Sequence, residues 1–92
     1  MKNIITIPSN CYKNVHSIAN QHYDIEIDLT KFHYAVVYPS FYNCNFSRHK
    51  TKEAAIKDAD TSMMPTVIDS WGNCYDIVYG ELQPIEGQCF RN

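Results

Sequence analysis

The residues with the clearest chemical pattern are those at 24–28, which read Asp-Ile-Glu-Ile-Asp. Side chains alternate between the two faces of a β-strand, so Asp24, Glu26 and Asp28 are expected to share one face. The isoleucines between them and Leu29 supply the opposite, apolar face. At about 3.4 Å per residue, the carboxylates would lie roughly 6.8 Å apart. Such a row of charge can imitate DNA phosphates toward a protein that binds DNA through Lys and Arg.

Other acidic residues and one tryptophan are candidates to extend this surface. They are Asp58, Asp60, Asp69, Trp71 and Asp76. Trp71 is included because tryptophan is enriched at binding hot spots. The alternative for the 24–28 row is the ordinary solvent-exposed face of a half-buried antiparallel strand.

Asp69 has two interpretations. A two-residue turn at Gly72-Asn73 would place Asp69 opposite Asp76, and like charges in that position are destabilising. A four-residue type I turn from Asp69 to Gly72 uses Asp at the first position and Gly at the fourth, which such turns favour. We favour the four-residue turn.

A basic and aromatic segment supports a different function. It spans residues 41–52 and contains Phe41, Tyr42, Phe46, Arg48, His49, Lys50 and Lys52. Cations for phosphates and aromatic rings for bases are the means by which proteins bind single-stranded nucleic acid. The alternative function is therefore a small RNA- or single-strand-binding module. Three cations are few, however, and the net charge of −2 is far from the basic charge typical of nucleic-acid-binding proteins, so direct binding of nucleic acid is not the favoured expectation.

The charges are unevenly distributed along the chain. The first 52 residues hold three acidic and six basic residues, whereas residues 53–92 hold seven acidic and two basic ones. This gradient favours a surface with a charged partner, unless folding mixes the two halves.

No catalytic motif of the common hydrolase, nucleotide-binding or metalloprotease types is present, and the chain has three glycines. The cysteines, at positions 11, 44, 74 and 89, lack zinc-site spacing and are expected to be reduced and buried. A weaker alternative is a small enzyme in which the thiol of Cys11 pairs with His16, or that of Cys44 pairs with His49. We expect no enzyme activity, no cofactor and no metal; a metal site assembled across the fold is the remaining alternative.

Hydrophobic periodicity predicts the elements that position these residues. Strands are expected at Ile4–Ile7, Tyr23–Leu29, Phe32–Tyr38, Thr66–Ile68 and Cys74–Tyr79. Helices are expected from Ser9 or Asn10 to Ala19, and over Lys52–Met63 after a Thr51 cap. Residues 40–50 are expected to form an irregular edge strand or a loop, and the tail after Gly80 is left open.

These elements predict one α+β domain over residues 1–92. Its mainly antiparallel sheet would have 4–5 strands with two helices packed on one face, in the order β-α-β-β-α-β-β. The N-terminus lacks a signal-peptide core and no apolar run is long enough to cross a membrane, so a cytoplasmic location is expected.

The opening Met1-Lys2-Asn3-Ile4-Ile5 and the aromatic-rich stretch Phe32–Phe46 are similar in style to small early proteins of T-even-type bacteriophages. In length and acidic display the chain resembles the anti-restriction proteins among them. That resemblance implies a dimeric DNA mimic acting in the host cytoplasm against a DNA-binding or defence protein. The leading hypothesis is accordingly a non-enzymatic inhibitor, with Asp24, Glu26 and Asp28 at its centre and a homodimer lengthening the row.

Overall fold

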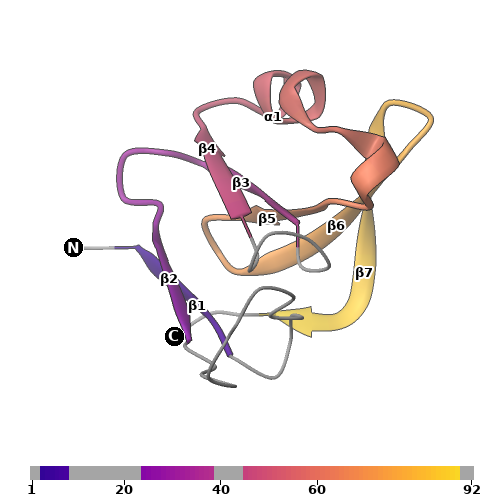
Figure 1. Cartoon of the computed structure of the whole chain (residues 1–92). Coiled ribbons are helices and arrows are strands. Elements are labelled where there is room, and N and C mark those ends of the chain that lie inside the picture. The colour runs from indigo at the N-terminus through magenta and orange to yellow at the C-terminus, as the bar shows by residue number, and fades with distance from the viewer. Residues whose placement is uncertain (1–2, 9–23, 39–44, 90–92) are drawn as a thin grey trace, which may run out of the picture.

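The structure is a computed structural model, which describes residues 3–8, 24–38 and 45–89. These residues form two β-sheets, one α-helix and a short 3-10 turn. Figure 1 shows three layers, with a two-stranded ribbon on one side of a larger sheet and the helix on the other. In chain order the elements are β1 (Ile4–Ile7), β2 (Ile25–Asp28), β3 (Tyr34–Tyr38), β4 (Asn45–His49), α1 (Lys52–Asp58), η2 (Thr61–Met63), β5 (Thr66–Asp69), β6 (Asn73–Val78) and β7 (Glu81–Cys89).

The larger sheet has five antiparallel strands in the order β4-β3-β5-β6-β7. β3 is an inner strand, since Val36 lies opposite Ser47 of β4 on one side and Val67 of β5 on the other. Its β-branched and aromatic residues suit that position. β4 and β7 form the two edges, so residues 45–49 and the tail after Gly80 both contribute edge strands.

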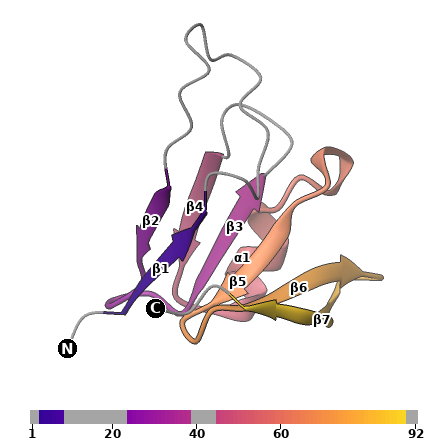
Figure 2. The same ribbon diagram turned by 90° about the horizontal axis from the view of Figure 1, so that it is seen from below.

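The ribbon of β1 and β2 covers one face of the larger sheet (Figure 2). Its inward side chains include Ile5 and Ile27, which are buried together with Val37 and Ile68 of the larger sheet. The sequence alternation of residues 25–29 is confirmed: Ile27 and Leu29 are buried, whereas Glu26 and Asp28 are exposed.

Helix α1 covers the other face of the larger sheet. Ala55 packs against Val36 and Val67, and all three side chains are fully buried. The Thr51 cap is confirmed, because its hydroxyl oxygen accepts the Ala54 N–H at 3.1 Å. The small Ala55 side chain allows the helix to approach the sheet closely.

The helix is shorter than the sequence predicted. It ends at Asp58, and the Asp60 side chain accepts hydrogen bonds from the Ser62 N–H at 3.1 Å and the Ser62 hydroxyl at 2.6 Å, so it caps η2 instead. Met64 then adopts a left-handed backbone with φ of 51°. The expected continuation of the helix to Met63 is therefore wrong, because a second N-cap interrupts it.

The predicted architecture is also wrong. The described residues are mostly strand and contain one α-helix. β1 and β2 form a separate two-stranded ribbon instead of belonging to the one sheet that was predicted. The expected order β-α-β-β-α-β-β with two helices on one face does not fit. The helix predicted from Ser9 or Asn10 to Ala19 lies outside the described residues.

Candidate functional site

The acidic row remains on the outer face of the β1–β2 ribbon. Glu26 and Asp28 lie on the exposed side of β2, opposite Thr6 and Ile4 of β1, and Asp24 is exposed just before the strand. Asp28 also has a structural role, because its Oδ1 accepts the N–H of Thr30 at 2.9 Å. This is the only part of the proposed acidic surface that forms a row along one strand.

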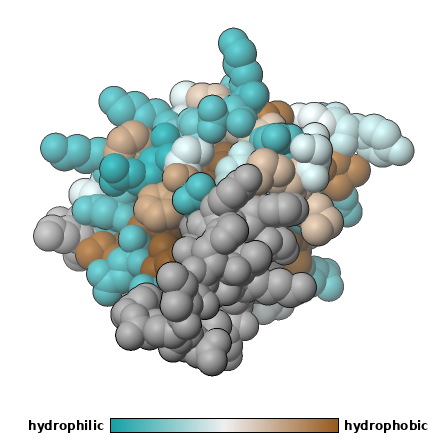
Figure 3. Space-filling view, in the orientation of Figure 1, coloured by the Kyte–Doolittle hydropathy of each residue, from teal (hydrophilic) through white to brown (hydrophobic). Residues whose placement is uncertain are grey.

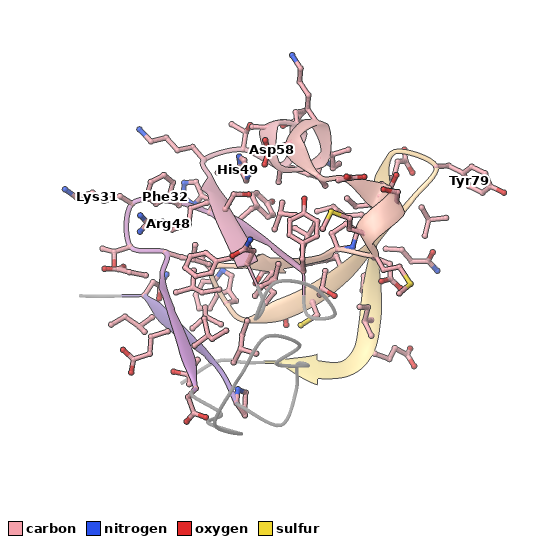
Figure 4. All side chains as sticks on the ribbon, viewed as in Figure 1. Lys31, Phe32, Arg48, His49, Asp58 and Tyr79 are labelled. Carbon is pink, nitrogen blue, oxygen red and sulfur yellow. The ribbon has the colours of Figure 1, made fainter. Side chains whose placement is uncertain are left out.

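Asp58 and Asp60 lie in a different layer, at the end of α1 and beyond the larger sheet from β2 (Figures 1 and 4). The Oδ2 atom of Asp58 accepts the Ser47 hydroxyl at 3.1 Å and lies 3.3 Å from Nε2 of His49. These contacts tie α1 to β4. The β2 row therefore does not continue through Asp58 and Asp60.

Ser47, His49 and Asp58 do not form a hydrolytic triad. The Ser47 hydroxyl lies 2.9 Å from the same Nε2 atom of His49 that faces Asp58. In a triad the acid holds the second ring nitrogen, so that the first can take the proton of the serine. The three residues are arranged as a polar link between strand and helix.

Asp69 is buried at 8% exposure and organises the turn between β5 and β6. Its carboxylate accepts the Trp71 N–H at 2.9 Å, the Asn73 N–H at 3.0 Å and the Asn73 amide at 3.2 Å. The Tyr75 hydroxyl donates to it at 2.7 Å. This hydrogen bond, followed by burial and the negative charge of Asp69, raises the pKa of Tyr75 to about 12.

The four-residue turn is confirmed, since the Gly72 N–H donates to the Asp69 carbonyl at 3.0 Å. Asp76 lies opposite Gln83 of β7 rather than opposite Asp69. The carboxylate of Asp69 is enclosed by the turn, and Asp76 is exposed on β6. The sequence-predicted acidic residues thus fall in separate parts of the molecule, and the fold does not bring them into one surface.

The fold does bring cations and aromatic rings together at one end of the larger sheet. The Arg48 guanidinium lies 4.7 Å from the centre of the Phe32 ring, and its Nη1 donates to the Asp28 carbonyl at 3.2 Å. Lys31 joins them around a hollow of about 330 Å³. Figure 4 shows Lys31, Phe32 and Arg48 on the same side of the molecule.

A second hollow, of about 530 Å³, lies between the start of β3, the start of α1 and the β5–β6 turn. Lys50 and Lys52 line it together with the carboxylates of Glu53 and Asp69. Trp71 also lines it, and its side chain is 60% exposed in the turn that Asp69 holds. The two hollows share no lining residue: Phe32 of the first packs against the core on the ribbon side of the larger sheet, whereas Tyr34 of the second packs on the helix side. Figure 3 shows many hydrophilic residues around β4 and α1, with apolar residues among them.

We call the two hollows and the adjoining residues of β4 the basic end, and define it by its charged and aromatic members. They are Lys31, Phe32, Phe46, Arg48, Lys50, Lys52 and Trp71. Phe46 and Arg48 share one side of β4, opposite Val37 and Ala35 of β3. Sequence reasoning identified Phe46, Arg48, Lys50 and Lys52 as one segment, assigned Trp71 to the acidic surface instead, and missed Lys31 and Phe32. The antiparallel pairing of the Phe32–Tyr38 strand with the segment after it was the signal that could have found them.

Several sequence candidates cannot be placed. Phe41 and Tyr42 of the basic and aromatic segment, and the pairs Cys11–His16 and Cys44–His49, lie wholly or partly outside the described residues. Cys74 is buried in the core beneath the ribbon. In the part of the chain that is described, no group of three His, Cys, Asp or Glu side chains is arranged to bind a metal ion.

None of the helices within residues 3–8, 24–38 and 45–89 has the length and apolar character required to cross a bilayer. Comparison of the chain with models of known protein families, with curated proteins and with solved structures gives no match.

Proposed function

We propose that the protein is a non-enzymatic binding module that takes single-stranded nucleic acid at its basic end. The observation that carries this proposal is the convergence of Lys50 and Lys52 on a hollow beside the exposed ring of Trp71. Proteins that bind single strands combine a positively charged groove with aromatic rings on which bases stack. A base on Trp71 would leave its flanking phosphates within reach of the two lysines.

Arg48 and Phe32 offer a second set of contacts, in the hollow on the ribbon side of the larger sheet. The guanidinium keeps donors beyond the one used on the Asp28 carbonyl, because arginine has five. A phosphate bound there would lie beside the Phe32 ring, in the hollow that Lys31 also lines. The basic end has only four cations, and carboxylates lie near them. We therefore expect modest affinity for nucleic acid, with a dissociation constant on the order of 10 µM at low salt.

The test follows the fluorescence of Trp71, which is the single tryptophan of the chain. Titration with an oligothymidylate of about 15 nucleotides should quench its fluorescence, since bases stack on the ring. With about four phosphates neutralised, a plot of log affinity against log salt should have a slope of about −2 to −3. Trp71→Ala, followed by anisotropy of a labelled strand, should weaken binding roughly 5- to 150-fold, the range expected for one stacked base.

Lys50→Ala and Lys52→Ala should each weaken binding and make the salt slope shallower by about 0.7. The matched control is Lys57→Ala, which removes an equal charge from α1 at a residue that lines neither hollow. Equal losses in all three lysine variants would indicate attraction to overall charge only. That result, or unchanged binding by Trp71→Ala, would contradict the proposal.

A second candidate is the acidic inhibitor in the host cytoplasm, now centred on β2 alone. It is supported by the exposure of Glu26 and Asp28 on one strand face with Asp24 beside them. A protein with this function should protect DNA from cleavage by a host restriction nuclease. The combined variant Asp24→Asn, Glu26→Gln and Asp28→Asn should lose that protection while its unfolding curve stays the same. Full protection by the triple variant would exclude this candidate.

A further inference from the structure

The hollow beside Trp71 holds carboxylates that the binding of phosphates does not use. Glu53 and Asp69 line it together with the two lysines and the tryptophan ring. Phosphates carry negative charge and repel carboxylates, so an acidic side chain here can contribute to binding only through the base. The volume of about 530 Å³ is within the range of small-molecule pockets and has room for a whole base.

Asp69 has no capacity left to accept hydrogen bonds from a base. Its Oδ1 accepts the N–H groups of Trp71 at 2.9 Å and Asn73 at 3.0 Å. Its Oδ2 accepts the Asn73 amide at 3.2 Å and the Tyr75 hydroxyl at 2.7 Å. A carboxylate offers about four lone-pair positions, and these four bonds occupy them. The carboxylate of Asp69 therefore serves the turn and not a ligand.

Glu53 has its full capacity. Its side chain is exposed in the first turn of α1, and none of the residues that the structure describes donates a hydrogen bond or forms an ion pair with its carboxylate. The Thr51 cap and the buried Ala55 fix the backbone on either side of it. Glu53 thus offers two unused acceptor oxygens to the hollow from a fixed position on the helix.

The bases differ in what they offer to a carboxylate. Proteins bind the bases of single strands by stacking on the ring and by hydrogen bonds to the Watson–Crick edge. Guanine has two adjacent donors on that edge, N1–H and the N2 amine, which match the two oxygens of a carboxylate. Adenine and cytosine have one amino group beside an acceptor nitrogen. Thymine and uracil have one N–H between two carbonyl oxygens, which a carboxylate repels.

We infer that this hollow selects guanine. The base stacks on Trp71, and its N1–H and N2 amine donate to the two carboxylate oxygens of Glu53. The inference rests on the proposed binding of single strands at the basic end, where Lys50 and Lys52 bind phosphates whatever the base. Because Glu53 is exposed to solvent, we expect a preference near the lower end of the range for a bidentate contact to a base, about tenfold over thymine.

The probes are three trinucleotides of equal charge. Each has thymine at both ends, and the middle base is guanine, hypoxanthine or thymine. Hypoxanthine keeps the purine ring and N1–H but lacks the N2 amine, so it separates stacking from hydrogen bonding. By quenching of Trp71 fluorescence, the guanine probe should bind about tenfold more tightly than the thymine probe and about threefold more tightly than the hypoxanthine probe.

The protein variant is Glu53→Gln, which keeps the size and the helix propensity of the side chain. It replaces one acceptor oxygen by an amide donor, so the guanine preference should fall to within about twofold of thymine. Binding of the thymine probe should not weaken, because the lysines are unchanged. Glu81→Gln is the matched control, since it makes the same change at an exposed residue of β7 outside the hollow, and it should keep the preference.

The outcomes separate this inference from the function on which it rests. Equal binding of the guanine and thymine probes would overturn the selection of guanine and leave the binding of single strands intact. Equal binding of guanine and hypoxanthine, or a guanine preference that survives Glu53→Gln, would assign the preference to purine stacking and also overturn the inference. Absence of quenching by every trinucleotide and by the oligothymidylate would overturn the proposed function, and the inference with it.

Discussion

Replacement of Asp69 should reveal how firmly the β5–β6 turn is held. Its carboxylate accepts four hydrogen bonds, from two backbone N–H groups, the Asn73 amide and the Tyr75 hydroxyl. A hydrogen bond to a charged group contributes about 1.5–3 kcal/mol, although bonds that share one carboxylate do not add in full. Asp69→Ala leaves these donors in a partly closed turn, and we expect it to lower the free energy of unfolding by about 3–4 kcal/mol.

Asp69→Asn separates shape from charge. The amide oxygen can still accept the N–H groups of Trp71 and Asn73, but the amide nitrogen faces the Asn73 side chain, which is also a donor there. We expect a smaller loss, about 1–2 kcal/mol. The pKa of Tyr75, about 12 in the wild type, should fall toward its ordinary value near 10, because the acceptor that favours the protonated phenol is gone.

The pH dependence of stability follows from the same contact. Because folding raises the pKa of Tyr75 from 10.0 to about 12, its contribution is complete below pH 10 and is lost as the pH rises through 12. The phenol is only partly buried, so we expect this contribution to be no more than about 1–2 kcal/mol. Urea unfolding from neutral pH to pH 12, with tyrosine absorbance titrated in parallel, measures both quantities.

The control is Asp76→Ala, which removes an exposed carboxylate from the same hairpin and should change stability by less than about 0.5 kcal/mol. An Asp69→Ala variant as stable as Asp76→Ala would refute the assignment of the turn to this carboxylate. A Tyr75 pKa that stays near 12 in Asp69→Asn would show that burial, rather than the hydrogen bond, causes the shift.

Three further substitutions test the fold. Ile27→Ala should cost about 2–5 kcal/mol in urea unfolding, because Ile27 is fully buried between the β1–β2 ribbon and the larger sheet; a loss below 1 kcal/mol would mean that the ribbon is not packed there. Thr51→Ala should cost about 1 kcal/mol through loss of the cap on Ala54, whereas Thr51→Ser should restore it. Gly80→Ala should cost about 1 kcal/mol in the same assay, since φ is +75° and a methyl group there meets no atom within 4 Å; a larger loss would point to a contact not seen in the structure.

The sequence predicts local structure here better than it predicts which elements pack together. Alternation at residues 24–28 correctly assigns their buried and exposed faces, and the turn chemistry of Asp69 and Gly72 correctly selects the four-residue turn. Both patterns act within a few residues. Period-two alternation says that β2 has one buried face, but it does not say which sheet covers that face.

The helix boundary and the site were missed for related reasons. Asp60 supplies a second N-cap that ends the helix early, and the sequence prediction did not consider it. The contact of Arg48 with Phe32 depends on the register of β3 and β4, which short-range patterns do not encode. The acidic residues of the chain's second half also do not form one surface. Asp58 and Asp60 lie at the end of α1, Asp69 lies in the β5–β6 turn and Asp76 lies on β6.

The net charge of −2 does not preclude a surface that attracts phosphates. At about 0.1 M salt, exposed charges farther apart than roughly 10 Å hardly influence one another. A strand of nucleic acid at the basic end is therefore attracted mainly by the charges beside it, which are those of Lys50 and Lys52 in one hollow and of Lys31 and Arg48 in the other.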